Sequence, residues 1–212
     1  WRPLSDGVAK DVTRMWVPRF VCPDCRRRVS DASDGTLFCS ACDRRFDRRQ
    51  GIYRFLVGRE TDSTERFVRQ YRTVRERDGY RRQSAEYYRM LPIVPNDDPR
   101  KAEWRIRRES YASLLRLALP GISRSASRVL DLGAGSGWLA HRLASRGHSV
   151  AAVDRLDDDV DGLGACRHYS VAFPAVQADF DALPFASGEF DVAVLNGSLH
   201  YSADPIATLA DA

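Results

Sequence analysis

The chain has 212 residues, of which 43% are hydrophobic and 29% are charged. It contains no apolar run close to the roughly 18 residues that a membrane span needs, and it shows no signal-peptide pattern. These properties exclude a membrane-spanning protein. They favour a two-part globular protein of the cell interior, and we expect a cytoplasmic location.

Charge is divided unevenly along the sequence. Residues 1–128 hold 29 Lys and Arg against 17 Asp and Glu, whereas residues 129–212 hold 4 against 12. Such a division fits a front half that faces nucleic acid, and it equally fits attraction between a basic and an acidic half. Both interpretations stay open at this point.

Four of the five cysteines form two C-x-x-C knuckles, Cys22 with Cys25 and Cys39 with Cys42, separated by 13 residues. Thiolates at this spacing converge on one ion, and a closed set of four cysteines is typical of structural zinc. Disulfides and a rubredoxin-like iron site are the alternatives. The fifth cysteine, Cys166, is most simply a small buried apolar residue.

Residues 61–127 are predicted to be mainly helical. One helix is expected over residues 64–78, with Phe67, Tyr71 and Val74 on one face and Gly79 as its stop. A second helix is expected after Asp97 or Asp98, with Pro99 in its first turn. Its apolar stripe comprises Trp104, Tyr111, Leu114, Leu115 and Ala118.

A glycine-rich turn follows the apolar pair Val129 and Leu130 and precedes a helical stripe that begins at Trp138. The spacing is Asp-x-Gly-x-Gly-x-Gly, with Asp131, Gly133, Gly135 and Gly137 at its fixed positions. A dinucleotide fingerprint requires its third glycine at position 138, where this chain has tryptophan. Asp131 would repel a pyrophosphate, so the turn suits a ligand with a cationic centre and no phosphates. The alternative is an ordinary tight turn.

Three further segments follow in order. The apolar run 148–153 ends at Asp154, the run 175–178 leads into Asp179 and Phe180, and the run 190–195 ends at Asn196. Each run is predicted to be a buried strand. Asp154 and Asp179 are candidate site residues, although both residue types also serve as helix caps or turn residues.

The segment 131–137 resembles motif I of the class I S-adenosylmethionine-dependent methyltransferases, and the later segments match that family in order. The resemblance implies an α/β, Rossmann-like sheet and S-adenosyl-L-methionine as cofactor. It implies that Asp154 accepts hydrogen bonds from the ribose hydroxyls and that the Asp179 segment holds the adenine edge. The cofactor-binding candidates are Asp131, Gly133, Ala134, Gly135, Gly137, Asp154, Asp179, Phe180 and Asn196.

The stretch 197–201 is similar to the one that follows strand four in methyltransferases acting on small molecules. It makes His200 and Tyr201 the catalytic candidates, with a structural histidine as the alternative for His200. In the family, helices before motif I help to build the acceptor site. That makes Tyr80, Tyr87, Tyr88, Trp104 and Arg105 candidates for acceptor contacts, although packing onto the sheet is favoured for them.

The cysteine region resembles the zinc-ribbon activator subunit shared by several methyltransferases. A zinc site also precedes the catalytic domain in bacterial ribosomal RNA guanine methyltransferases, where the last ligand is usually histidine rather than a cysteine such as Cys42. We therefore expect a zinc ribbon at residues 1–60, a helical linker or cap at 61–127 and a class I methyltransferase domain at 128–212. Because 16 residues follow Asn196 and the family's full sheet has seven strands, that sheet is expected to be truncated after its fourth strand.

The predicted reaction is direct methyl transfer, for which the protein aligns an acceptor behind the sulfonium carbon and removes a proton where the acceptor carries one. The Asn-Pro-Pro-Tyr type of loop is absent after strand four, and no Pro-Cys nucleophile follows it, which disfavours base amines and pyrimidine carbon as acceptors. A small molecule, such as a lipid or cofactor-pathway metabolite, is the leading acceptor. The alternatives are ribosomal RNA, as in a guanine methyltransferase, and a non-catalytic cofactor-binding or scaffold module.

Overall fold

The computed structural model describes residues 15–56, 62–118 and 126–211. Its centre is a six-stranded sheet with the strand order β4-β5-β8-β7-β6-β9. All neighbouring strands are parallel except β4 and β5. The bounds are β4 Arg48–Arg49, β5 Ile52–Arg54, β6 Arg128–Leu132, β7 Ser149–Asp154, β8 Ala175–Gln177 and β9 Val192–Val194.

The four predicted strands are present as β6, β7, β8 and β9, and the α/β class with a parallel sheet is confirmed. Their spatial order places the first strand, β6, between β7 and β9. In this order the connections leaving β6 and β9 diverge to opposite sides, which opens a crevice at the carboxyl ends of the strands. A ligand site is expected there in open α/β sheets.

Two strands from the cysteine-containing part extend the same sheet. The hairpin of β4 and β5 turns at Gln50 and Gly51, which both have positive φ. Strand β5 then pairs in parallel with β8, with Tyr53 opposite Val176. The segment predicted as a zinc ribbon thus contributes the sheet edge beside β8, while the domain boundary at residue 60 stays a prediction.

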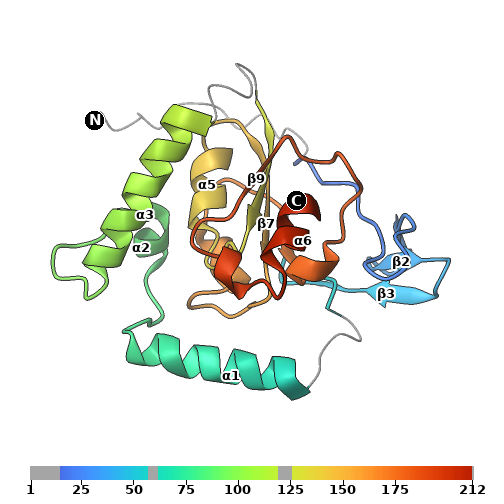
Figure 1. The fold of residues 1–212 in the computed structure, drawn as a ribbon, viewed down its shortest axis with the longest axis horizontal. Coiled ribbons are helices and arrows are strands. Elements are labelled where there is room, and N and C mark those ends of the chain that lie inside the picture. The colour runs from blue at the N-terminus through green and yellow to red at the C-terminus, as the bar shows by residue number, and fades with distance from the viewer. Residues whose placement is uncertain (1–14, 57–61, 119–125, 212) are drawn as a thin grey trace.

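A second, three-stranded antiparallel sheet surrounds the cysteines. It consists of β1 (Ser30–Asp31), β2 (Leu37–Cys39) and β3 (Arg44–Phe46). Figure 1 shows β2 and β3 beside the large sheet, at the side away from α3. Phe20 and Phe46 from this region share one apolar core with Leu130 and Leu132 of β6. The cysteine region therefore packs onto one face of the large sheet.

Helices cover the opposite face, where Val129 and Val150 pack against Trp104 and Leu139. Alternate β6 residues enter the two cores, as the pleat of a strand requires. The helices that contribute to this core are α2 Ala85–Met90, α3 Lys101–Ser113 and α5 Trp138–Ala144. The other described helices are α1 Asp62–Arg77 and α6 Pro205–Asp211, and the short helical turns are η1 Leu114–Ala118, η2 Leu163–His168, η3 Phe180–Ala182 and η4 Leu199–Tyr201. None of the described helices is long and apolar enough to cross a membrane.

The predicted helices differ from the observed ones mainly at their ends. Helix α1 ends two residues before Gly79, which has the positive φ expected of a stop. Helix α3 begins at Lys101, after the predicted Pro99, because the Asp98 carboxylate accepts the Arg100 N–H at 2.7 Å and holds a turn there. Trp104 in its stripe is buried as predicted. The side chain of Phe67 lies outside the described part.

Candidate active site

A cavity of about 310 Å³ lies at the carboxyl ends of β6, β7 and β9. The glycine turn after β6 and the residues that follow β7, β8 and β9 line it, and α1 and α3 contribute from the other side. Its lining residues are Tyr71, Arg75, Arg107, Gly133, Ala134, Gly135, Ser136, Trp138, Asp154, Arg155, Leu156, Asp161, Ala178, Asp179, Phe180, Asp181, Asn196, Gly197, Ser198, Tyr201, Ser202 and Ala203.

The glycine turn is held against β7 by its own backbone. The N–H groups of Gly133 and Ala134 donate to the Val153 carbonyl at 2.8 and 2.9 Å. Gly133, Gly135 and Gly137 all have a positive φ, which residues with a side chain rarely adopt. Gly133 and Gly135 line the cavity, whereas Gly137 lies under it, where a Cβ would come within 2.5 Å of the Cys166 sulfur. The turn thus places bare backbone against the cavity.

Replacing Gly133 by alanine should destabilise the chain by about 3 kcal/mol. The left-handed backbone accounts for about 1 to 2 kcal/mol, and the new Cβ would overlap the Ser198 side chain for a further 1 to 3 kcal/mol. The matched control is Gly188→Ala, because Gly188 also has a positive φ but a Cβ added there would meet no other atom within 4 Å. Urea denaturation would measure both; equal losses would show that packing against Ser198 is unimportant.

Asp154, at the end of β7, lines the cavity and is held by two backbone donors. One carboxylate oxygen accepts from the Gly135 N–H at 2.8 Å and the other from the Leu156 N–H at 2.9 Å. Burial raises the pKa of Asp154, and these N–H groups act in the opposite direction. The two bonds fix the direction in which the carboxylate faces, so it is a rigid acceptor at the cavity wall.

Asp131 does not line the cavity. Its side chain is buried beneath the glycine turn and accepts the Ala140 N–H at 3.1 Å, which ties the end of β6 to the first turns of α5. Burial raises the pKa of Asp131, the Ala140 N–H lowers it and the nearby Asp154 raises it, and together these effects bring it to about 7. Its position supports the turn and places a buried carboxyl behind it.

The remaining cofactor candidates lie around the cavity. Asp179 forms an ion pair with Arg155, and both line the wall together with Phe180. Asn196 lines it where β9 ends. Ala134, also predicted, is a buried lining residue.

The two catalytic candidates occupy different positions. Tyr201 lines the cavity and packs edge-on against the ring of Tyr71, with ring centres 5.7 Å apart. His200 is exposed, is absent from the lining and packs beside the Tyr201 ring. The structure therefore brings Tyr201 to the site and leaves His200 at its outer rim.

Sequence reasoning missed a polar cluster that α1 brings to the cavity. The Arg75 Nε lies 3.1 Å from an Asp161 oxygen and donates to the Tyr71 hydroxyl at 2.7 Å. Burial raises the pKa of Asp161 more than Arg75 and Arg107 lower it, and the result is a pKa of about 7. The available signal was the crowding of acidic residues at 157–161 together with arginines at every third position of α1. Only their combination in three dimensions forms a site.

The aromatic acceptor candidates are packed into the fold. Tyr80, Tyr88 and Trp104 are buried, and none of these three lines the cavity. The Tyr88 hydroxyl donates to the carbonyls of Asp159 and Val160, and Trp104 packs edge-on against Trp138. Two further candidates, Tyr87 and Arg105, also lie outside the lining, and Arg105 is exposed. The geometry agrees with the favoured packing interpretation.

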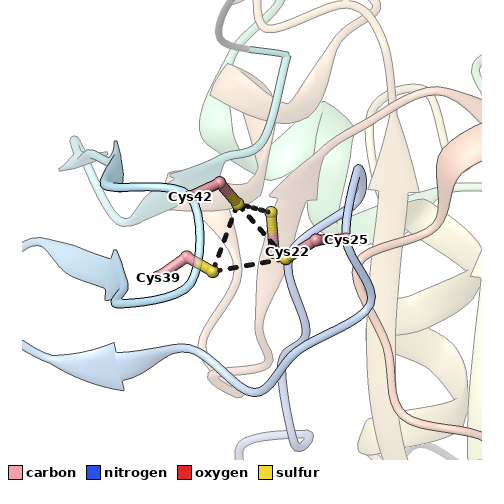
Figure 2. A group of neighbouring side chains, drawn as sticks. All are labelled: Cys22, Cys25, Cys39 and Cys42. Atoms are coloured by element: carbon pink, nitrogen blue, oxygen red, sulfur yellow. Dashed lines mark hydrogen bonds between the residues drawn. The ribbon is translucent and has the colours of Figure 1, made fainter.

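The four predicted metal ligands lie together in the described structure. The sulfur atoms of Cys22, Cys25, Cys39 and Cys42 all lie within 4.8 Å of one another, and four of their separations are 3.2 to 3.5 Å (Figure 2). A disulfide would need about 2.05 Å, and all five cysteines are free thiols. Sulfurs bound to one zinc ion at about 2.3 Å would lie about 3.8 Å apart, so the donor set fits a tetrahedral thiolate site.

Arginines of the basic half pair with the acidic half. Such pairs join Arg54 to Asp157, Arg75 to Asp161 and Arg82 to Asp159 at 2.6 to 3.1 Å. Within the cysteine region, Arg44 pairs with Asp24 and Arg45 with Asp34. Of the two interpretations of the charge division, the structure therefore supports attraction between the halves.

A methyltransferase domain family has a model that matches residues 104–212 of this chain. Among curated proteins, the malonyl-[acyl-carrier protein] O-methyltransferase of Erwinia pyrifoliae is 38% identical over 86 residues, which cover 41% of this chain and 30% of that protein. An uncharacterized methyltransferase of Mycobacterium tuberculosis is 33% identical over 87 residues, 41% of this chain and 34% of its own. The matches thus span about a third of these relatives.

Solved structures give a weaker likeness. The 1,6-didemethyltoxoflavin-N1-methyltransferase of Burkholderia thailandensis, solved with bound 1,6-didemethyltoxoflavin and S-adenosylhomocysteine, is 22% identical with a TM-score of 0.33. That alignment covers 56% of this chain and 60% of the other. WbdD aligns with 21% identity and a TM-score of 0.30, over 56% of this chain and 26% of its own.

Proposed function

The chain belongs to the methyltransferase domain family, whose model matches about half of it, and from this we propose that it transfers a methyl group from S-adenosylmethionine to a small-molecule acceptor. The cavity at the ends of β6, β7 and β9 would hold the cofactor. The observation that carries the proposal is the fixed Asp154 carboxylate facing this cavity beside the bare backbone of Gly133 and Gly135.

The donor set of the cavity suits this cofactor. A carboxylate can accept hydrogen bonds from two neighbouring hydroxyls, which is the arrangement that a ribose offers Asp154. Trp138 occupies the position where a dinucleotide site has its third glycine, and the absence of that glycine argues against a pyrophosphate. The ring of Phe180 provides an apolar wall for a flat base.

The charge of the cavity also suits a cationic ligand. Asp154 lines the wall and Asp131 lies directly behind it, and burial raises the pKa of both, whereas Asp161 is already paired with Arg75. Ionised carboxylates in so little solvent are costly, and a positive ligand offsets part of that cost. When bound, S-adenosylmethionine supplies a methyl group on a cationic sulfur.

The residues around the cavity have separate proposed roles. The glycine turn and Asp154 bind and orient the cofactor, Asp179 and Phe180 border its base, and Asn196 lies at the rim after β9. Tyr201 is the proposed group for removing a proton from an acceptor that carries one, because it is the catalytic candidate that lines the cavity. The four cysteines are proposed to bind one structural zinc ion, since a closed thiolate set leaves no position for a substrate.

A small-molecule acceptor is favoured over RNA because several arginines of the basic half are already paired with carboxylates. Arg44 and Arg45 of the cysteine region pair with Asp24 and Asp34, and Arg72 and Arg75 of α1 pair with the acidic segment. Phosphate binding would require arginines that are available to neutralise a backbone. Two curated relatives are named for methylation of malonyl-acyl-carrier protein, which is likewise not an RNA.

Replacing Asp154 by alanine should weaken binding of S-adenosylhomocysteine by about 1 to 3 kcal/mol, because charge-assisted hydrogen bonds to the ribose are lost. Asp159→Ala is the matched control, since Asp159 lies five residues along, pairs with Arg82 and does not line the cavity. Titration calorimetry would compare both with the unchanged chain. Equal affinities for all three chains would remove Asp154 from the site.

The acceptor class can be tested with a labelled methyl group. S-adenosylmethionine carrying the label is incubated with the chain and, separately, with a small-molecule extract and with ribosomal RNA. Label in the small-molecule fraction is expected. Label in RNA would favour the guanine methyltransferase alternative, and cofactor binding without any transfer would favour a non-catalytic module.

A further inference from the structure

The loop that borders the base side of the cavity is attached to the cysteine knuckle. After the lining residues 179–181, the chain continues through Leu183, Pro184 and Phe185. The backbone carbonyls of these three residues all accept hydrogen bonds from the cysteine region. Arg26 donates to Leu183 at 2.6 Å and to Phe185 at 2.9 Å, and the Val21 N–H donates to Pro184 at 2.9 Å.

Arg26 occupies a special position in the knuckle. It follows Cys25 directly, its N–H donates to the Cys22 carbonyl at 2.9 Å, and its φ is +60°. The left-handed backbone and the knuckle turn together set the direction of the guanidinium. The planar guanidinium then bridges two carbonyls of the loop, which a single point donor would not do.

Further contacts join the same two segments. The Ala186 N–H donates to the Arg19 carbonyl at 3.0 Å, and Phe20 forms an antiparallel β-bridge with Phe185. The rings of Phe20 and Phe185 are stacked, with their centres 5.8 Å apart. These contacts hold the segment against the sheet. Arg26 is the side chain that links it to the sulfur cluster itself.

We propose that Arg26 is a positioning residue, through which the four-cysteine knuckle sets the loop 179–185 at the cofactor cavity. This inference rests on the proposed function for the cavity and on the cysteines as a metal site. It implies that metal binding and cofactor binding assist each other, because a coupling between two sites acts equally in both directions.

The test compares Arg26→Asn with Arg27→Asn. Asparagine tolerates the left-handed backbone at position 26, and its short side chain cannot reach the loop carbonyls. Arg27 is the adjacent exposed arginine and serves as the matched control. Arg26→Asn should keep its metal content and bind S-adenosylhomocysteine about tenfold more weakly, whereas Arg27→Asn should match the unchanged chain.

Two other measurements separate positioning from general stability. Amide hydrogen exchange over residues 179–186 should rise in Arg26→Asn and stay unchanged in Arg27→Asn. In competition with a chelator, saturating S-adenosylhomocysteine should tighten zinc binding severalfold in the unchanged chain and have no such effect in Arg26→Asn. If Arg26→Asn does not fold, Arg26→Lys replaces it, with an intermediate affinity expected because lysine offers one point donor.

The outcomes are distinguishable. A folded Arg26→Asn chain with unchanged affinity and unchanged exchange would overturn the inference. If the unchanged chain itself fails to bind S-adenosylhomocysteine, the proposed function fails, and the exchange measurement still decides whether Arg26 positions the loop.

Discussion

A Cys39→Ser chain should lose its zinc and its folded cysteine region. Cys39 is fully buried at the end of β2, and its sulfur lies 3.4 and 3.5 Å from those of Cys42 and Cys25. Metal binding at thiolate sites of this kind contributes about 10 kcal/mol or more of folding free energy, because the site does not exist in the unfolded chain. Removing one ligand should therefore cost several kcal/mol.

The loss should reach the large sheet as well. Cys39 and Phe46 share a core with Leu130 and Leu132 of β6, so unfolding of the cysteine region exposes one face of that sheet. Elemental analysis and thermal unfolding would measure both effects. Cys166→Ser is the control, because Cys166 lies outside the cluster and burial raises the pKa of its thiol, which disfavours a thiolate. Retention of one zinc by Cys39→Ser, or no zinc in the unchanged chain, would contradict the assignment.

An Asp131→Asn chain should be more stable than the unchanged chain above neutral pH. Burial raises the pKa of Asp131 to about 7 from an ordinary 3.8. Between these two values the folded state holds a proton that the unfolded state has released, so the stability of the unchanged chain falls as pH rises from about 4 to about 7. This fall in the free energy of unfolding amounts to at most about 4 kcal/mol.

Asparagine removes this dependence and can still accept the Ala140 N–H. The two chains should therefore have similar stability near pH 4 and diverge towards pH 8, as measured by urea denaturation at a series of pH values. Asp191→Asn is a control for which the pH dependence of stability should have the opposite sign. Arg128 lowers the pKa of Asp191, so that carboxylate stabilises the fold above its ordinary pKa, and the benefit is lost in acid. Parallel pH profiles for Asp131→Asn and the unchanged chain would contradict the prediction.

Local patterns predicted the central strands and the turn. The segment from Asp131 to Gly137 combines a strand end, three positive-φ glycines and a helix start within a few residues, so its structure depends little on distant contacts. The apolar runs that became β7 and β9 were equally recognisable. The two C-x-x-C motifs likewise predicted that the four cysteines lie close together.

The unpredicted features depend on contacts between distant segments. Strand β5 has three residues, too few for a periodic pattern, and its place beside β8 is decided by pairing between residues 123 positions apart, such as Ile52 and Ala175. Arg75 reaches the cavity because α1 pairs with the acidic segment, which no local pattern on α1 reveals. Helix α2 has six residues, too few for its own bounds to be predicted within the segment 61–127 that was expected to be mainly helical.

The central claim is that the cavity lined by the glycine turn and Asp154 holds S-adenosylmethionine. It is tested most directly by photocrosslinking the labelled cofactor to the unchanged chain and mapping the modified peptides, because aromatic side chains line the cavity at Tyr71, Trp138 and Phe180. The account predicts label on peptides containing these residues and its loss when unlabelled S-adenosylhomocysteine is added in excess, with no such competition by NAD. Label confined to other peptides, or label that competitor does not displace, would contradict it.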